Sequence, residues 1–224
     1  MARIARVVVP GLPHLVIQRG ADNRQVFFSA DDYRDYIKLV GESCARWKVR
    51  IWAYCLMPNR VHLVVQPTTE NALARALGEA HRRYAKKVNE RAGRAGRLWH
   101  ARFSSCALQQ SWLTKAMRFV ERTPVDSGML PSVADYPWCS ASARLKGGED
   151  AMGVKGLPQG VRNWANFVGK SNEEEDQKLL LAHERTGRPI GDKEWVMKLE
   201  EDLGRRLRPR KRGRKPKNRP AEED

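Results

Sequence analysis

Two apolar runs near the middle of the chain are separated by a turn signal. Residues 50–57 and 61–65 are rich in β-branched, aromatic and aliphatic side chains, which is typical of strands. Pro58 cannot donate to a strand ladder and Asn59 tolerates turn geometry. The pattern therefore predicts two strands that reverse at Pro58–Asn59.

The second of these strands presents polar residues on one face. Side chains alternate between faces with a period of two, so Arg60, His62 and Val64 share one face. The opposite face is wholly apolar: Val61, Leu63 and Val65. A cation and a histidine among apolar neighbours are how a strand presents a site.

The flanking pattern predicts two more strands and two helices. The two strands are predicted over 14–18 and 99–108. The first helix is capped by Asp31 or Asp32 and runs to about Trp47. The second helix is opened by Thr68 or Thr69 and is ended by Gly93 and Gly96. The order β-α-β-β-α-β indicates an α+β, ferredoxin-like fold: a four-stranded antiparallel sheet with helices on one face. We expect the central hairpin to supply its inner strands.

The C-terminal part is predicted to be helical. A third helix spans 111–122 and should stop at Pro124, and a glycine-rich linker with a short helix follows over 146–170. Asn172 and Asp192 are candidate caps of two further helices within 171–204. This helix–turn–helix order fits either a DNA-reading unit or a helical hairpin that covers the sheet.

Charge points to a polyanionic partner. The formal net charge is +16 with a pI of about 10.1, and nucleic acid is the first candidate. The tail, residues 205–224, carries a net +7 and is expected to be disordered when free. It reads either as a nonspecific electrostatic tether or, through Arg212 and Arg214, as a hook for an AT-rich minor groove.

The other compositional signals favour a cytoplasmic protein. No apolar run is long enough to span a bilayer, and the N-terminal apolar stretch is too short for a signal peptide. The four cysteines are scattered without a CxxC pair, which favours buried free thiols over a zinc site: Cys44, Cys55, Cys106 and Cys139.

Several segments, in order, resemble one family. PNRVHLVV (58–65) resembles PNHVHLLV, and FVERTPVDSGML (119–130) resembles YIELNPVRAGMV. The two segments that they resemble are typical of the REP-associated tyrosine transposases, which are IS200-like, single-tyrosine HUH transposases. Residues 1–145 would then form a transposase-like HUH domain, and the protein would be nucleoid-associated.

The resemblance implies a reaction whose parts are substituted here. In the family, two histidines and an amide hold Mg²⁺ or Mn²⁺, and a tyrosine attacks the DNA phosphate to form a 5′-phosphotyrosine link. Arg60 stands at the first histidine, His62 remains, Phe119 stands at the tyrosine and Thr123 at the amide. The resemblance therefore implies a metal that is not bound tightly and impaired catalysis.

Two substitutes for the missing parts are conceivable from the sequence. Arg60 could clamp a phosphate in place of the metal, but a tyrosine would still have to attack. Tyr54, Tyr84 and Tyr136 are the candidate nucleophiles, and His81 and His100 are candidate substitute ligands. A place in the core fits Tyr84 and His81 better, because both lie on an apolar helical stripe.

The binding half of the family's function is intact in the sequence. We expect phosphate contacts from Arg19, Arg24, Arg82, Arg83, Lys86, Lys87, Arg94, Arg97, Arg212 and Arg214. The leading hypothesis is a transposase-like protein that binds single-stranded DNA hairpins at repeated palindromes, as a monomer or a homodimer. The alternatives are an active transposase that cleaves and rejoins single-stranded DNA, and an RNA-binding module.

Overall fold

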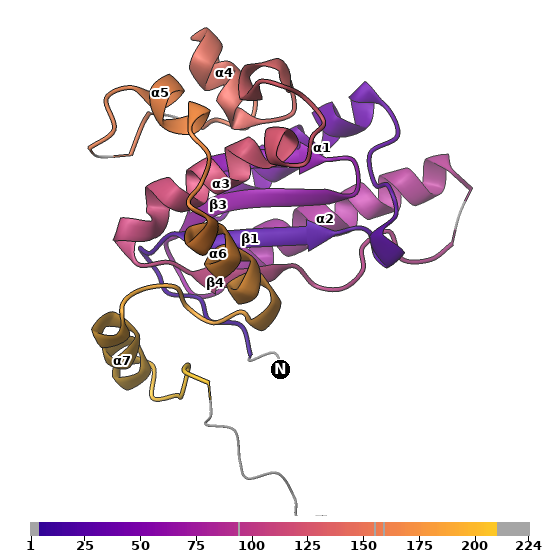
Figure 1. Cartoon of the computed structure of the whole chain (residues 1–224). Coiled ribbons are helices and arrows are strands. Elements are labelled where there is room, and N and C mark those ends of the chain that lie inside the picture. Colours follow the sequence, from indigo (N-terminus) through magenta and orange to yellow (C-terminus); the bar gives the residue numbers. More distant parts are fainter. Residues whose placement is uncertain (1–4, 94, 155, 159, 210–224) are drawn as a thin grey trace, which may run out of the picture.

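A four-stranded antiparallel sheet organises the molecule (Figure 1). The computed structural model describes residues 5–93, 95–154, 156–158 and 160–209. The strands are β1 (His14–Arg19), β2 (Val49–Met57), β3 (Arg60–Pro67) and β4 (Ser104–Ala107), in the order β2-β3-β1-β4. This order, with helices in the β-α-β-β-α-β sequence, confirms the predicted ferredoxin-like fold.

Two details of the predicted sheet are wrong. The inner strands are β1 and β3, so the central hairpin supplies one inner and one edge strand. The last strand is also shorter than the predicted 99–108. The amide of Gln18 donates to the carbonyl of Ala101 at 3.0 Å, so a side chain takes over where ladder bonds would continue, and Trp99 forms only an isolated bridge with Gly20.

Helices α1 (Ala30–Arg46) and α2 (Ala72–Arg91) cover one face of the sheet. The apolar side of β3 packs under them, as predicted: Val61, Leu63 and Val65. The predicted caps are wrong. Ser29 caps α1, with Asp32 as the reciprocal partner of a capping box, and Asn71 occupies the cap position of α2.

The other face is covered by the C-terminal half. Its elements are α3 (Leu113–Asp126), α4 (Ser140–Lys146), α5 (Trp164–Gly169), α6 (Glu174–Thr186) and α7 (Lys193–Asp202), with short 3₁₀ turns at Gln110–Trp112 and Val133–Asp135. A further 3₁₀ turn, Ala21–Asn23, follows β1. In Figure 1, α3 and α6 lie in front of the sheet, and α1 and α2 lie behind it. Both faces of the sheet are therefore buried.

Of three predicted helix boundaries on this side, one is confirmed and two are wrong. Pro124 does not stop α3, which continues to Asp126, because the last turn closes through a bond from the Ser127 amide to the Thr123 carbonyl. Asn172 does not cap α6; its side-chain oxygen accepts from Arg118 at 2.9 Å instead. Asp192 caps α7, as predicted, by accepting from the Trp195 amide.

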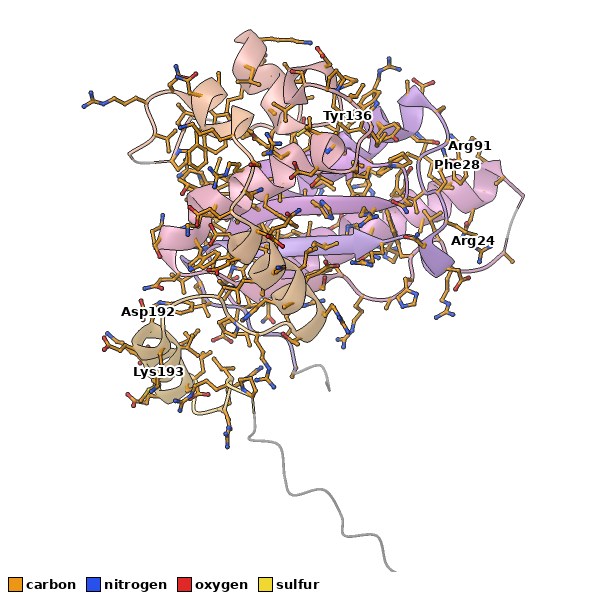
Figure 2. The ribbon with its side chains drawn as sticks, in the orientation of Figure 1. Arg24, Phe28, Arg91, Tyr136, Asp192 and Lys193 are labelled. Atoms are coloured by element: carbon orange, nitrogen blue, oxygen red, sulfur yellow. The ribbon has the colours of Figure 1, made fainter. Side chains whose placement is uncertain are left out.

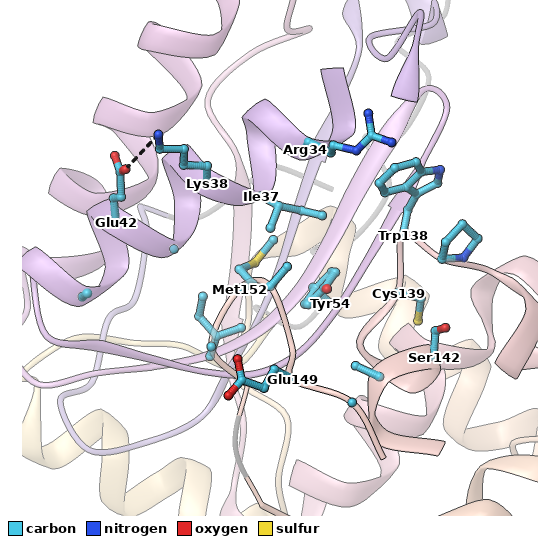
Figure 3. A pocket seen from close by; sticks show the side chains of 18 of the residues that line it. Arg34, Ile37, Lys38, Glu42, Tyr54, Trp138, Cys139, Ser142, Glu149 and Met152 are labelled. Carbon is cyan, nitrogen blue, oxygen red and sulfur yellow. Dashed lines mark ion pairs between the residues drawn. The ribbon is translucent and has the colours of Figure 1, made fainter. Parts of the chain in front are cut away.

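The glycine-rich segment packs against the sheet domain. Met152 is buried in the cluster under α1, and residues 137–153 line a cavity of about 830 Å³ together with α1 and β2 (Figure 3). The predicted domain boundaries, including that of residues 1–145, stay a prediction. The four cysteines are buried and free, as expected. No helix within the described ranges is long and apolar enough to cross a membrane.

Candidate functional site

Three positions singled out in the sequence meet between β3 and α3. The imidazole Nδ1 of His62 lies 3.0 Å from the Thr123 hydroxyl, and the rings of His62 and Phe119 are 6.0 Å apart. Phe119 and Thr123 are one helical turn apart and share the face of α3 that packs on the sheet. The face of β3 that carries His62 packs against this face of α3, so the two elements bring the three side chains together.

The hydrogen bonds assign the proton on His62. The Thr123 hydroxyl donates to the Phe119 carbonyl at 3.1 Å, so it accepts from the Nδ1–H of His62. The other ring nitrogen, Nε2, then keeps its lone pair. Burial, and secondarily the charges of Arg60 and Arg19, lower the pKa of His62 from 6.5 to about 3. The imidazole is therefore neutral across the physiological range.

Residues 13–123 match the family model described as "Transposase IS200 like". The chain belongs to the IS200-like transposase family. This segment holds the sheet, α1, α2 and most of α3, and it ends on Thr123. The family assignment therefore covers all three positions of the site.

One solved structure shares the fold, and two others are similar only at lower TM-scores. A REP-associated tyrosine transposase bound to a REP hairpin is 16% identical, with a TM-score of 0.52 over 73% of this chain and 99% of that one. A putative transposase from Deinococcus radiodurans R1 is 19% identical, with a TM-score of 0.34 over 54% and 97% of the two chains. A bacterial tRNA(His) guanylyltransferase-like protein in complex with GTP is 10% identical, with a TM-score of 0.35 over 57% and 73%. No curated protein matches the chain in sequence.

The donor set at the site does not fit the family's divalent metal. His62 offers one nitrogen and Thr123 a weak hydroxyl ligand, while Arg60 has no lone pair to give. Nowhere in the described ranges do three or more His, Cys, Asp or Glu side chains gather in a way that could hold a metal. Arg60 is half-buried, and its Nε donates to the Asn59 side chain at 3.3 Å. His62, Thr123 and Arg60 therefore do not form a site for a divalent metal.

No tyrosine is placed to replace the one missing at Phe119. All five tyrosines of the chain are buried: Tyr33, Tyr36, Tyr54, Tyr84 and Tyr136. The hydroxyls of Tyr84 and Tyr136 donate to backbone carbonyls of Val26 and Leu56. Burial raises the pKa of Tyr54, Tyr84 and Tyr136, which makes each a weaker nucleophile at neutral pH.

The two other histidines weighed as ligands lie apart from the site. His81 is buried between α1 and α2, where its Nε2 is 2.8 Å from the Tyr36 hydroxyl, and burial lowers its pKa to about 3. This confirms its predicted structural place. His100 is exposed in the segment before β4, where its amide donates to the Arg19 carbonyl.

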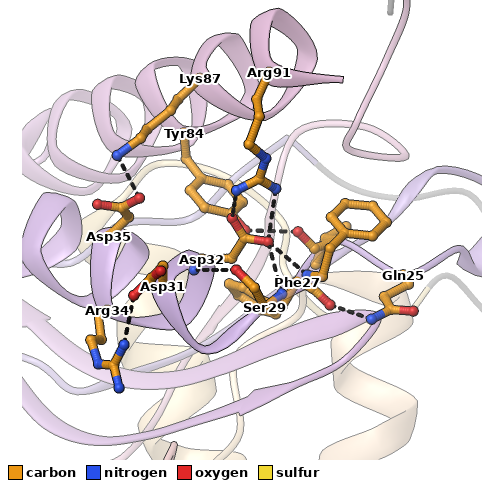
Figure 4. A network of polar contacts seen from close by, with 12 residues as sticks. Gln25, Phe27, Ser29, Asp31, Asp32, Arg34, Asp35, Tyr84, Lys87 and Arg91 are labelled. Carbon is orange, nitrogen blue, oxygen red and sulfur yellow. Dashed lines mark hydrogen bonds and ion pairs between the residues drawn. The ribbon is translucent and has the colours of Figure 1, made fainter. Parts of the chain in front are cut away.

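Four of the predicted phosphate contacts lie together on α2. Arg82, Arg83, Lys86 and Lys87 are all exposed, and we call them the basic face of α2. Three form surface ion pairs, of which Lys87 with Asp35 is the shortest at 2.5 Å (Figure 4). Such pairs are weak and salt-screened, so a phosphate can displace them.

The remaining predicted contacts are scattered. Arg24 is exposed and pairs with Asp22, and it lies at the same end of the molecule as Arg91, away from α7 (Figure 2). Arg97 is exposed in the loop after α2. Three others lie outside the described residues: Arg94, Arg212 and Arg214.

Arg19 has a partner that sequence reasoning missed. Its Nε and Nη2 both donate to one carboxylate oxygen of Glu184, at 2.9 and 2.6 Å. Glu184 is buried on α6, on the same stripe as Asp176 and Leu180. The sequence does carry a signal for this pair. Asp176 and Glu184 lie four residues before and after Leu180, so all three share one face of the helix, and a carboxylate buried on that face needs a cation.

A second buried carboxylate holds α3 to the C-terminal half. Glu121 is fully buried, and burial raises its pKa despite contacts with Arg144, Ser140 and Trp164. Because Glu121 lies between Phe119 and Thr123 but points toward the side of α4 and α5, it fixes the rotation of α3. That rotation is what aims Phe119 and Thr123 at His62.

Proposed function

We propose that this IS200-like transposase homologue binds single-stranded DNA hairpins without forming the family's tyrosine link to DNA. One observation carries the second half of the proposal: the position of the family tyrosine is a phenylalanine, and every tyrosine of the chain is buried. A phenyl ring has no oxygen to attack phosphorus, so phosphotyrosine chemistry has no exposed nucleophile here.

Charge supports the binding half. The basic face of α2 offers four exposed cations, and Arg24 and Arg97 add two at the loop end of the sheet. The family is one of DNA transposases, and the solved transposase with the same fold is bound to a REP hairpin. DNA hairpins are therefore the nucleic acid that we propose for this surface.

The RNA-binding alternative is disfavoured by the sheet. RNA-recognition sheets stack unpaired bases on aromatic side chains of an open face. Here helices cover both faces, and the candidate aromatics Trp52, Tyr54 and Phe103 are buried. A specific RNA contact would need another surface.

The proposal is tested by native-gel titration of a DNA hairpin built from the repeats flanking the gene, with the same hairpin in RNA as competitor. We expect DNA binding that weakens steeply as salt rises, because phosphate contacts release counterions. We expect RNA to compete poorly. A flat salt dependence, or equal competition by RNA, would contradict the proposal.

A further inference from the structure

Two of the four buried cysteines lie directly opposite each other at the outer edge of β2. Cys139 forms an antiparallel bridge with Cys55. Beside this bridge, the amide of Leu56 donates to the carbonyl of Trp138 at 2.9 Å. Cys55 and Cys139 therefore lie between ladder hydrogen bonds and do not exchange bonds with each other, and Cα atoms in such a pair are about 4.5 Å apart.

This spacing suits a disulfide bond, which needs Cα atoms about 4.4 to 6.8 Å apart. The side chains of Cys55 and Cys139 both pack in the core cluster between the sheet and α3. Burial first, and then the neighbouring Cys55 thiol, raise the pKa of Cys139 well above its ordinary value. The two thiols are therefore neighbours, and joining them needs little movement of the backbone.

The other two cysteines are equally buried but lie elsewhere. Cys44 is on α1, in the cluster on the opposite face of the sheet. Cys106 lies opposite Leu15 in the β1–β4 register. They therefore serve as internal controls for any chemistry that needs two thiols side by side.

The 830 Å³ cavity leads from solvent to one member of the pair. Cys139 lines this cavity (Figure 3). The cavity is open to solvent, because exposed side chains also line it: Arg34, Lys38, Lys146 and Glu149. Cys139 itself is only 1% exposed, so a small oxidant can approach it more closely than a bulky one.

We propose that Cys55 and Cys139 are a redox modification site, at which hydrogen peroxide that enters through this cavity forms a reversible disulfide. The inference goes beyond DNA binding and does not depend on it. Because burial keeps the thiolate of Cys139 scarce, the pair stays reduced until peroxide is abundant.

The reaction takes two steps. The Cys139 thiolate attacks one oxygen of the peroxide and the O–O bond breaks, which leaves a sulfenic acid on Cys139 and a hydroxide that takes up the thiol proton as water. The Cys55 sulfur then attacks the Cys139 sulfur, and the hydroxyl group leaves with the Cys55 proton as a second water. The two thiols lose two electrons, and one peroxide is reduced to two waters.

The disulfide would change how the edge of β2 is covered. In the reduced protein, the Cys139 thiol donates to the Glu121 carbonyl on α3 at 3.6 Å, and a disulfide sulfur has no proton to donate. In exchange, the segment around Cys139 becomes covalently tied to β2. Because the bond closes a long loop of the unfolded chain, we expect the oxidised protein to resist unfolding better.

The experiment treats the full-length protein with hydrogen peroxide, blocks the remaining thiols with N-ethylmaleimide and maps the peptides by mass spectrometry. We expect wild type to lose two of its four thiols, to yield a peptide that joins Cys55 to Cys139, and to recover both thiols with dithiothreitol. The urea midpoint of the oxidised protein should rise on the order of 1 M. This result on wild type needs no variant that has to fold.

Matched variants and a second oxidant test the two parts of the proposal. Cys44→Ala and Cys106→Ala should form the disulfide as wild type does, whereas Cys55→Ala should stop at a sulfenic acid on Cys139 that dimedone labels. Oxidised glutathione, which is bulky, should react at least 10-fold more slowly than peroxide. No thiol loss, or a disulfide between other cysteines, would overturn the pair. Equal rates with the two oxidants would overturn the cavity as the route.

Discussion

The site on β3 and α3 keeps the arrangement of the family's site but not its reactive groups, whereas the basic face of α2 keeps the charged groups themselves. At the site, His62, Phe119 and Thr123 retain the arrangement that the family motif implies, but the atoms that would carry the chemistry are absent. On α2, four cations stay exposed and only weakly paired. Packing and the hydrogen bonds of His62 and Glu121 preserve the first arrangement without the family tyrosine, since a phenyl ring fills the volume beside His62 as well as a phenol would. The geometry of a site is therefore weak evidence for its reaction.

The largest effect is expected from restoring the missing atoms. The combined change Arg60→His, Phe119→Tyr and Thr123→Asn supplies a nucleophile and two ligands beside His62. We expect a covalent protein–DNA adduct that requires Mg²⁺ or Mn²⁺, where wild type gives none. A denaturing gel of labelled hairpin DNA measures it.

The matched control is the pair Arg60→His and Thr123→Asn with Phe119 unchanged. It should form no adduct, because it has ligands but no hydroxyl. An adduct from this pair would mean that another residue attacks, and the comparison between the two regions would fail.

The second largest effect is expected on the basic face of α2. Replacing Arg82, Arg83, Lys86 and Lys87 by alanine should weaken hairpin binding on the order of 100-fold at moderate salt and make the salt slope shallower by about 3. Binding isotherms at several salt concentrations measure both quantities.

A matched control set, also of two arginines and two lysines, lines the 830 Å³ cavity: Arg34, Lys38, Arg50 and Lys146. Replacing these four by alanine lowers the net charge equally. We expect a much smaller loss of affinity. Similar losses in both variants would mean that total charge, and not the α2 surface, determines binding.

The third prediction concerns the buried imidazole of His62, whose protonation should make the stability of the fold depend on pH. His62 has a pKa of about 3 in the folded chain against 6.5 in a free histidine, so protonation favours the unfolded state. The difference in unfolding free energy between wild type and His62→Gln should have its full value above about pH 6.5. It should shrink by about 1.4 kcal/mol per pH unit as the pH falls toward 4.

Urea titrations of wild type and His62→Gln at several pH values measure that difference. The variant comparison is needed because burial lowers the pKa of His14 and His81 as well, to about 4 and about 3. A difference that stays constant with pH would show that His62 is hydrated and open, in conflict with a dry site.

The smallest effect concerns Arg19, which lies opposite Arg60 on the neighbouring strand β1. Glu184→Gln keeps the shape of the partner of Arg19 but removes the negative charge that neutralises its guanidinium. We expect hairpin affinity to rise about threefold and stability to fall by about 1 kcal/mol, since a charged hydrogen bond becomes a neutral one. Weaker DNA binding would mean that Glu184 positions Arg19 for DNA instead of competing with it.

Much of the sheet and the site could be predicted from local pattern. The alternation along β3 predicted that Arg60, His62 and Val64 share one face, and the helical period put Phe119 and Thr123 on one face of their helix. That these two faces pack against each other is seen only in the structure. The inner and edge strands could not be told apart in this way. Strand order depends on long-range pairing of β1, whose partners are residues 60–65 and 104–107.

The misses share a physical cause, which is competition from tertiary contacts. Pro124 costs α3 one backbone bond, but packing of the helix on the sheet carries the turn past it. Asn172 is drawn from its cap position by Arg118, and Arg19 is paired with a residue 165 positions away. Local propensity has no access to such partners.

The central claim is that the family fold binds DNA here without the family's covalent link. The most direct measurement incubates wild-type protein with labelled single-stranded hairpin DNA and Mg²⁺ or Mn²⁺, then resolves one half on a denaturing gel and the other on a native gel. The account predicts a shifted complex on the native gel and no covalent adduct on the denaturing gel. An adduct from wild-type protein would contradict it, and mapping the attached residue would identify the nucleophile.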